Sequence, residues 1–451
     1  MIKLFIYYSS YFFVALALAH LCFQRKYHAV DALFVIGVLL VPIGKLFYLP
    51  IPGMVSVKAA FIYTGVIGSV ILLIRLIEGI PRAVLFPILF TVPILLSVVF
   101  LDRAMQGVFL SSGGGNNGTA FLRLISIFLS TIYCCYVIDH IRASETGYHD
   151  VARYYVIATL FATAIGALIF YGLFIGQLSM ADVTPISVGR PHVIGGKIFR
   201  FNPGANVNEF GEIIGYALLM LRWTQWRTSI KTLAALVLLF AEFLGLTRGA
   251  WVGLFAAYLV YTLFTEGRLR KRMLTAAAFA IAVVVIIALS WSDFRQLLLS
   301  RMQLSAGAGG HERIRSVTAA IGVITSSMLR LLFGAGWAAD VYSNRFGLAD
   351  VGQIHDVPTM ILFNTGIVGT SIYIVLLYLV FRFVYQNSNE NRGILLSILT
   401  FMITVSLFEH NFFHVQTWLM LGVVIGMAQR SAYQSQSPLR IGSQPPEAVH
   451  G

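Results

Sequence analysis

The stretch QIHDVPTMILFNTGIVG, residues 353–369, places a histidine and an aspartate directly before a long apolar segment. About 20 apolar residues in a row are enough to cross the hydrocarbon core of a bilayer as a helix. Pro358 suits the first turn of such a helix, because the N–H that proline lacks would have no partner there. We therefore predict a membrane-spanning helix over 358–381, with His355 and Asp356 at its entrance.

The rest of the chain has the composition of a protein that crosses the membrane many times. Of its 451 residues, 58% are hydrophobic and 11% are charged, with a mean hydropathy of +0.81. Soluble domains contain only about 45–50% apolar residues. Apolar runs of spanning length recur throughout, so we predict an all-α polytopic membrane protein with 12 or 13 transmembrane helices. The predicted spans are 4–22, 30–49, 57–74, 84–101, 119–138, 154–175, 207–221, 231–246, 249–264, 273–291, 358–381, 394–408 and 412–428.

We expect residues 1–433 to form a single transmembrane domain and residues 434–451, rich in Ser, Pro and Gln, to form a disordered cytoplasmic tail. The cysteines Cys22, Cys134 and Cys135 fall inside apolar runs, so no disulfide framework is predicted. The sequence has no Walker loop, dinucleotide-binding fingerprint or metal-finger spacing. We therefore expect no cofactor, no bound metal and no nucleic-acid partner.

Lysine and arginine residues assign the two sides of the membrane, because short cytoplasmic loops are enriched in them. In one alternation of sides, the long segments 176–206 and 292–357 face the periplasm and most basic clusters face the cytoplasm. The cytoplasmic clusters are Arg25 and Lys26, Arg75 and Arg82, Arg142 and Arg153, Arg222, Arg227 and Lys231, residues 266–272, Arg382 and Arg392, and Arg430 and Arg440.

The second periplasmic segment should contain an amphipathic helix lying on the membrane surface. Its apolar residues recur at intervals of three and four, at Ile314, Val317, Ile321, Ile324 and Met328. Arg313 and Arg315 begin this helix and would lie at the level of the lipid headgroups.

The periplasmic segments carry more positive charge than this rule predicts. Long loops cross the membrane regardless of charge, so some of these cations fit ordinary solvated residues. Arg248 fits that interpretation badly, because the sequence LGLTRGAWVGL (244–254) places it in a turn of two or three residues between apolar helices. The guanidinium group suits phosphate, and each charge-assisted hydrogen bond to it contributes about 1.5–3 kcal/mol. We therefore expect an anionic, lipid-borne ligand at this face.

His355 and Asp356 each have a simple structural explanation as well. A histidine at a membrane interface is more often a hydrated or capping residue than a catalytic one. Asp356 can complement the positive end of the helix dipole. Their position alone therefore leaves both interpretations open.

Four short motifs follow one another on the predicted periplasmic side. They are Arg200 with NPGANVNEFG (202–211), TRG (247–249), Arg313 leading to LLFGAG (331–336), and His355 eleven positions before GIVG (366–369). In this order and spacing, over about 170 residues, the chain resembles the bacterial O-antigen ligase and O-antigen polymerase superfamily.

The chain departs from the pattern of that superfamily at four positions. Thr247 replaces the usual serine and keeps its hydroxyl group, and Val317 stands where tryptophan is common. Asp356 stands where asparagine often follows the histidine, and Asn364 stands where glutamate is frequent. The last departure weakens any mechanism that needs a carboxylate at this position.

The resemblance implies transfer of a glycan from undecaprenyl diphosphate at the periplasmic face of the bacterial inner membrane, without a metal and with inversion at the anomeric carbon. His355 would be the general base, and Arg200, Arg248 and Arg313 would bind the diphosphate. Asn208, Glu209, Arg315 and Asp356 are the supporting candidates.

The partners implied are the lipid-linked glycan donor, a glycan or lipid A-core acceptor, membrane lipids and, for a polymerase, a chain-length regulator. We favour polymerisation of O-antigen or exopolysaccharide repeat units, because no additional acceptor domain is evident in the sequence. Two alternatives remain: a ligase that transfers the glycan to lipid A-core or to protein, and a flippase or transporter of lipid-linked glycans. Transporters place ionisable groups near the bilayer midplane, whereas Glu242 is nearly the only acidic residue expected deep within a span here.

Overall fold

Most of the predicted spans are helices in the computed structural model of the chain. The structure describes residues 29–43, 59–76, 82–100, 117–144, 146–179, 193–194, 197–198, 207–245, 247–265, 308–340, 354, 356–409 and 414–436, with the isolated positions 12, 13, 16, 346 and 412. The predicted spans 4–22 and 273–291 lie largely or wholly outside this part of the chain. So do His355, Arg200 and residues 437–451 of the tail predicted over 434–451, whose first three residues belong to the C-terminal helix.

The described part is almost entirely helical, and each remaining predicted span overlaps at least one helix. The helices are α2 (Ala29–Ile43), α3 (Ala59–Leu76), α4 (Leu85–Leu89), α5 (Val92–Val99), α7 (Asn117–Ala143), α8 (Gly147–Phe174), α10 (Val207–Met220), α11 (Thr228–Gly245), α12 (Arg248–Leu263), α15 (Ala308–Thr325), α16 (Met328–Phe333), α17 (Val357–Asn387), α18 (Arg392–Ser406) and α19 (Val415–Gln436). Short 3-10 turns are η2 (Arg82–Val84), η3 (Leu221–Trp223) and η5 (Asn389–Asn391), and β1 (Val193–Ile194) pairs antiparallel with β2 (Lys197–Ile198).

Four helical segments of the described residues are long and apolar enough to cross a membrane: Arg123–Ala143, Gly147–Phe174, Thr228–Gly245 and Val357–Asn387. Shorter apolar helices, among them Arg392–Ser406, accompany them. The all-α membrane fold predicted from composition therefore agrees with the structure. The number of 12 or 13 spans stays a prediction.

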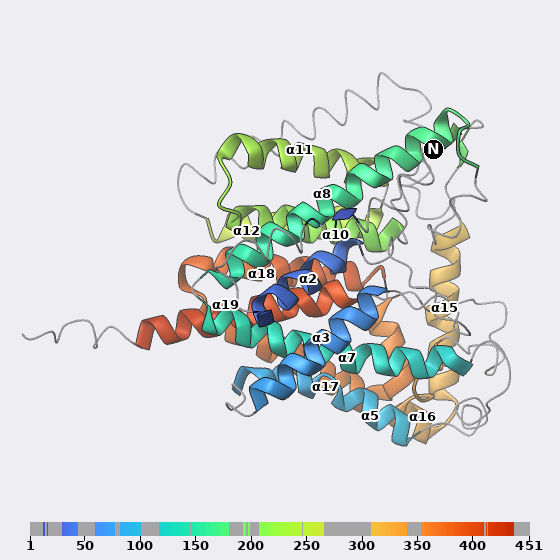
Figure 1. Ribbon diagram of the computed structural model, residues 1–451. Coiled ribbons are helices and arrows are strands. Elements are labelled where there is room, and N and C mark those ends of the chain that lie inside the picture. The colour runs from blue at the N-terminus through green and yellow to red at the C-terminus, as the bar shows by residue number, and fades with distance from the viewer. Residues whose placement is uncertain are drawn as a thin grey trace, which may run out of the picture.

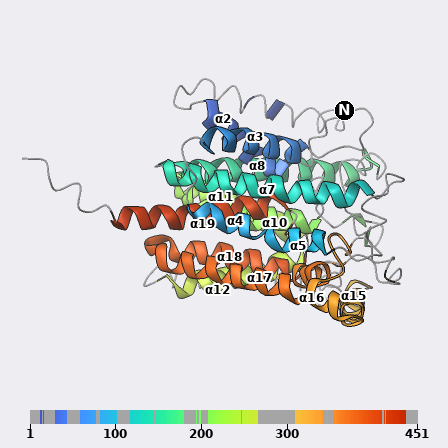
Figure 2. The same cartoon turned by 90° about the horizontal axis from the view of Figure 1, so that it is seen from below.

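The long helices lie side by side in layers (Figures 1 and 2). Figure 2 shows α2 and α3 on one side, α12, α17 and α18 on the other, and α7, α8 and α19 between them. Small residues allow close contacts, as where α19 packs on α7. A Cβ atom on Gly422 would lie 2.9 Å from the carbonyl oxygen of Cys134, and one on Gly426 would lie 3.2 Å from that of Ile138.

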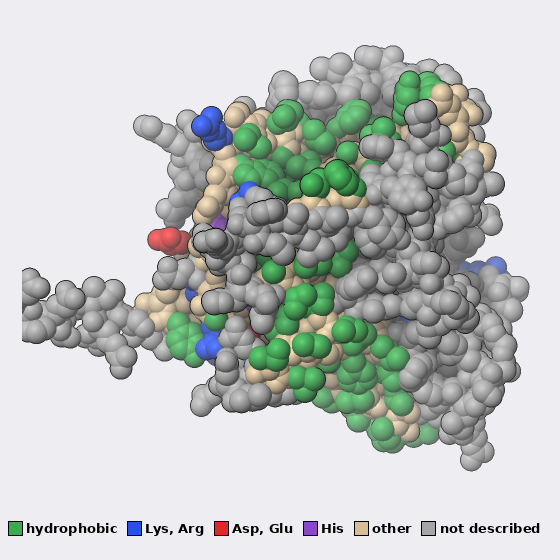
Figure 3. All heavy atoms as spheres, viewed as in Figure 1, with side chains coloured by type: hydrophobic (Ala, Val, Ile, Leu, Met, Phe, Trp, Pro, Cys, Tyr) green, Lys and Arg blue, Asp and Glu red, His purple; other side chains and the backbone are tan. Residues whose placement is uncertain are grey.

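Large apolar side chains cover the outer faces of this bundle. Leu233, Leu236 and Phe240 of α11 and Phe255 of α12 are exposed, as is Ile374 of α17. Figure 3 shows such side chains over much of the flank of the molecule. An exposed apolar surface of this kind suits contact with lipid rather than water.

Basic residues from separate elements meet at one end of the bundle, on the left in Figures 1 and 3. Arg430 of α19 donates to the carbonyl of Ser144, which follows α7, and Arg222 of η3 donates to Tyr261 near the end of α12. Trp223 of η3 donates to Asn391 of η5 over 3.3 Å. These contacts bring together loops that the charge pattern of the sequence assigns to one side of the membrane.

The helix predicted over 358–381 lies within α17, which is long and apolar enough to cross a membrane, but this helix is interrupted. Helical geometry is interrupted at Gly366, where φ is 64° and ψ is −167°, a conformation that is essentially restricted to glycine. The carbonyls of Phe363 and Asn364 instead accept hydrogen bonds from the backbone of Ala335 and Gly336, over 2.8 and 3.2 Å. A second chain segment therefore inserts into the break in α17.

Two further predicted helices are divided. The span 84–101 is split into α4 and α5 at Phe90 and Thr91. The apolar series from Ile314 to Met328 is split at Ser326 and Ser327, where Ser327 caps α16 by accepting from the backbone N–H of Arg330. Figure 1 shows α15 running across the direction of the other helices, and its Ile314 and Ile321 are exposed. The contact of this helix with the membrane surface stays a prediction.

Candidate functional site

A cluster of buried polar side chains lies at the end of the bundle opposite the basic loops. It is formed by the first turns of α10, the turn between α11 and α12, and the connection between α18 and α19. Each of these helices reaches the basic end at its other terminus, which places the cluster about one helix length away.

The α11–α12 turn carries Arg248 and packs closely on α10. A Cβ atom on Gly211 would overlap Oγ1 of Thr247 and lie 3.0 Å from Oε1 of Glu242, so only glycine fits at this contact. Thr247 donates its hydroxyl hydrogen to Glu242, and Trp251 donates its indole N–H to the carbonyl of Glu242 over 3.3 Å. The motifs that end at Gly211 and begin at Thr247 therefore form one contact surface.

The other side of the turn packs on the end of α18. A Cβ atom on Gly249 would lie 2.8 Å from Cβ of Phe408, the residue before Glu409. The residues on either side of Arg248 therefore pack on the start of α10 and the end of α18, and Arg248 itself is partly exposed.

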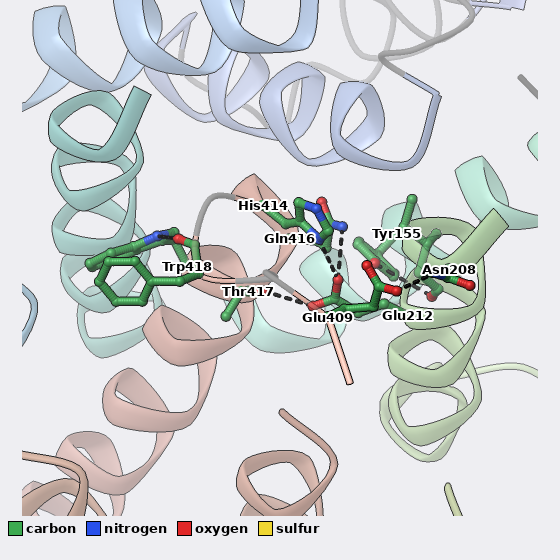
Figure 4. A network of polar contacts seen from close by, with 10 residues as sticks. Tyr155, Asn208, Glu212, Glu409, His414, Gln416, Thr417 and Trp418 are labelled. Carbon is green, nitrogen blue, oxygen red and sulfur yellow. Dashed lines mark hydrogen bonds and ion pairs between the residues drawn. The ribbon is translucent and has the colours of Figure 1, made fainter. Parts of the chain in front are cut away.

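Glu212 binds three donors from the start of α19, as Figure 4 shows. Nδ1 of His414 lies 2.7 Å from Oε2, Nε2 of Gln416 lies 3.2 Å from the same oxygen, and Oγ1 of Thr417 lies 2.7 Å from Oε1. Glu212 is only 1% exposed. These donors and the positive end of the α19 dipole stabilise the charge on a carboxylate that water does not solvate.

A second buried carboxylate, that of Glu409, lies beside the first (Figure 4). Asn208 of α10 donates its amide hydrogen to Oε1 of Glu409. Glu212 belongs to α10, and the buried Glu242 and Glu409 pack against the first turns of the same helix. In a membrane protein such residues are costly unless paired, and they commonly mark substrate or proton sites.

A further polar cluster stabilises the break in α17. Asp340 is fully buried and binds Nη1 of Arg123 through Oδ2 over 2.8 Å. Its Oδ1 accepts from the amide of Asn364 over 3.0 Å, and its backbone N–H donates to Oδ1 of Asn364 over 3.2 Å. The motif Gly334–Gly336 inserts beside Gly366, so this cluster joins the glycine motifs of two distant sequence segments.

Two of the predicted site residues, Arg248 and Asn208, lie on elements that pack together: the turn before Arg248 packs on Gly211 of α10, and Asn208 of α10 bonds Glu409 after α18. Glu209 lies beside Asn208 in the first turn of α10 and is partly buried. Asp356 is the N-cap of α17 and accepts from the backbone N–H of Thr359 over 2.8 Å, as its position in the sequence suggested.

Two further predicted site residues lie on α15, which is not one of the elements that form this surface. Arg313 and the exposed Arg315 lie in α15, whose described residues pack mainly on α16 and α17. His355 and Arg200 lie outside the described residues, so their roles stay predictions.

Sequence reasoning missed Glu409, His414, Gln416 and Thr417, all within FEHNFFHVQTW (408–418). The predicted span 412–428 begins too early and includes three of them, whereas α19 begins at Val415. The signal was present in the sequence as a group of polar residues between two apolar runs. The structure adds Glu212 and Glu409 to Glu242 as buried acidic side chains.

Among the described residues, no group of three or more His, Cys, Asp and Glu side chains has an arrangement that could hold a metal ion. Cys134 and Cys135 are buried free thiols. Comparison of the sequence with models of known protein families and with curated proteins gives no match.

Proposed function

We propose that this protein is a glycosyltransferase of the bacterial inner membrane that takes glycan from undecaprenyl diphosphate at the periplasmic face and polymerises repeat units. The observation that carries the proposal is the packing of the Arg248 turn on the start of α10 beside a cluster of buried carboxylates. The nature of the donor comes from the sequence resemblance.

Arg248 is the residue proposed to bind the diphosphate. Its turn is tightly packed through Thr247 and Gly249, so the guanidinium starts from a fixed backbone position. A preorganised donor of this kind stabilises charge that develops in the transition state without reorganising at that moment. Arg200 and Arg313 are proposed to assist on the strength of the sequence alone.

The proposed reaction has a simple balance of atoms and electrons. The acceptor hydroxyl oxygen forms a bond to the anomeric carbon, and the bond from that carbon to the diphosphate oxygen breaks. The electron pair stays on the departing diphosphate, where arginine stabilises it, and the hydroxyl proton passes to a base. His355 is the proposed base, because an unperturbed imidazole with a pKa near 6.5 can accept a proton at neutral pH.

The proposed orientation follows from the basic end of the bundle. Arg142, Arg222, Lys231, Arg392 and Arg430 lie there, and cytoplasmic ends of membrane helices are enriched in such residues. The Arg248 end would then face the periplasm, which is where enzymes of the superfamily that this chain resembles use lipid-linked glycans.

The rival transport function has one observation in its favour. The break in α17 at Gly366 makes a discontinuous helix, a feature that many secondary transporters use at their substrate sites. Against transport, the buried carboxylates of Glu212, Glu242 and Glu409 lie toward one end of the bundle rather than at its middle. A ligase that uses lipid A-core or protein as acceptor would share the whole donor site.

Reconstitution in proteoliposomes tests these functions together. Purified protein receives an undecaprenyl-diphosphate-linked oligosaccharide, first alone and then with lipid A-core, and products are resolved by mass. Longer lipid-linked glycan with release of undecaprenyl diphosphate supports polymerisation, and product only with lipid A-core identifies a ligase. Movement of intact donor between leaflets without bond cleavage would overturn the proposal in favour of transport.

A further inference from the structure

The segment inserted into the break of α17 is held by polar contacts from three helices. Ala335 and Gly336 donate to backbone carbonyls of α17, Trp337 donates to the carbonyl of Ser97 in α5 over 3.1 Å, and Asp340 pairs with Arg123 of α7. Ala338, with φ of 62°, is the one described non-glycine residue with a positive φ. Such strain persists only where the surrounding contacts determine the conformation.

Asn364 connects this segment to the first half of α17, residues 357–365. Its side chain makes two hydrogen bonds to Asp340, one to the carboxylate and one from the backbone N–H. Asn364 is 2% exposed and Asp340 is fully buried. A buried network of this kind loses its geometry when one member changes, because the others then lack partners.

The first half of α17 leads from this network to the proposed site. It begins at the N-cap Asp356, which directly follows His355 in the sequence. Its residues Met360 and Ile361 line a small apolar cavity together with Phe412, which belongs to the same α18–α19 connection as Glu409. A shift of this half-helix would therefore move its sequence neighbour His355 and also the α18–α19 connection that contains Phe412 and Glu409.

We propose that Asn364, Asp340 and Arg123 are positioning residues for the transfer reaction. They hold the first half of α17 in a fixed register against the inserted segment, and the break at Gly366 separates this half from the remainder of the helix. This inference rests on the proposed function and adds residues that act through α17 without touching the substrate. It also explains the amide at position 364: a carboxylate there would face the carboxylate of Asp340.

An exchange of the two side chains tests the proposal. Asn364→Asp alone places two carboxylates together. The double variant Asp340→Asn with Asn364→Asp moves the negative charge from position 340 to position 364 but allows every hydrogen bond to form again. The new amide at position 340 can accept from Arg123 and donate to the new carboxylate at position 364.

We expect the single variant to lower kcat by about tenfold or more with an unchanged KM for the lipid-linked donor, because small misplacements of reacting groups are costly. The double variant should recover most of kcat.

Asn387→Asp is the matched control, since it makes the same change in α17 beyond the break, where the amide donates only to the carbonyl of Phe383 over 2.8 Å. If Asn364→Asp does not insert, Asn364→Ala removes the same bonds without adding charge and should show the same loss of kcat. Normal kcat in both Asn364 variants would overturn the proposal. So would a well-folded double variant that stays inactive, because the charge on Asp340 itself would then be required.

The control for the proposed function is the wild-type protein in the same assay. If it releases no undecaprenyl diphosphate in the presence of acceptor, the proposed function fails. If it is active and the Asn364 variants are equally active, only the positioning role fails.

Discussion

Arg248 is the single residue on which the proposed donor site depends most. A charged side chain at the first position of α12, directly after a two-residue connection between apolar helices, needs a polar or anionic partner. The contacts at Gly211 and Gly249 fix the backbone on either side of Arg248, and the residue is partly exposed. It therefore combines a rigid backbone with partial exposure.

Arg248→Ala should abolish transfer while the protein is still inserted, and Arg248→Lys should recover little, because lysine lacks the planar fork that binds phosphate in a bidentate manner. The rate of undecaprenyl diphosphate release from proteoliposomes measures both variants. Arg227→Ala, an exposed arginine at the basic end, is the control and should keep full activity. Full activity of Arg248→Lys would reduce Arg248 to a general positive charge.

His355 can be tested against a purely structural role at the membrane interface. His355→Ala should lower the transfer rate by about 10²-fold or more with nearly normal donor binding, since proton removal matters in the transition state. His355→Gln can still form a hydrogen bond but cannot accept a proton, so it should not restore the rate. Loss of donor binding in both variants would place His355 with the arginines instead and require a different base.

At the scale of the secondary-structure element, α17 is the helix whose geometry the site depends on. Its start has the expected signals, with Asp356 as N-cap and Pro358 in the first turn. Its interior contains a break that helix propensity alone did not indicate. Gly334 and Gly366 have positive φ, and neither has room for a side chain. A Cβ atom on Gly334 would overlap the backbone of Asn364 and Thr365, and one on Gly366 would overlap the backbone of Leu332 and Gly334.

Gly366→Ala should destabilise the protein by at least about 1–3 kcal/mol, because this backbone conformation is unfavourable for any residue with a Cβ atom. The new Cβ would also overlap the carbonyl oxygen of Leu332. Thermal unfolding of the detergent-purified protein measures the change. Gly322→Ala in α15, where a Cβ meets nothing within 4 Å, is the control and should be neutral or slightly stabilising. Equal unfolding temperatures for the two variants would contradict the tight contact at the break.

At the scale of the whole molecule, charge and polarity divide the bundle into two ends. The cationic contacts of Arg222 and Arg430 lie at one end, and the paired carboxylates of Glu212 and Glu409 lie at the other. Apolar side chains cover the flanks between them. This division is what a chain inserted with its basic end in the cytoplasm would require.

Cysteine labelling measures the orientation directly. In a variant without the three native cysteines, Gln177→Cys, just after α8 and exposed, should react with an impermeant maleimide in intact cells. Gly267→Cys, within the basic run 266–272, should react only after the inner membrane is opened. The reverse pattern would invert the topology and move the proposed site to the cytoplasm.

The sequence by itself determined where most of the described helices lie, though not where three of them are interrupted, because length and hydropathy are local properties that the bilayer selects directly. It also determined the start of α17 and the grouping of basic loops, since caps and charge asymmetry are read from neighbouring residues. It predicted a tight turn at 247–249, and the ends of α11 and α12 confirm a short connection there, although Arg248 is the first residue of α12 rather than part of the turn.

Only the tertiary structure decided which faces of the helices meet. Side chains that face lipid and side chains that face other helices are both apolar, so periodicity does not distinguish them. The pairing of Asn208 with Glu409, which are 201 positions apart, and the break at Gly366 both depend on contacts between distant segments. The break at Gly366 forms because the backbone of the 332–336 segment approaches it so closely that only glycine fits. The distance between two segments that are far apart in the sequence cannot be inferred from the residues of either segment alone.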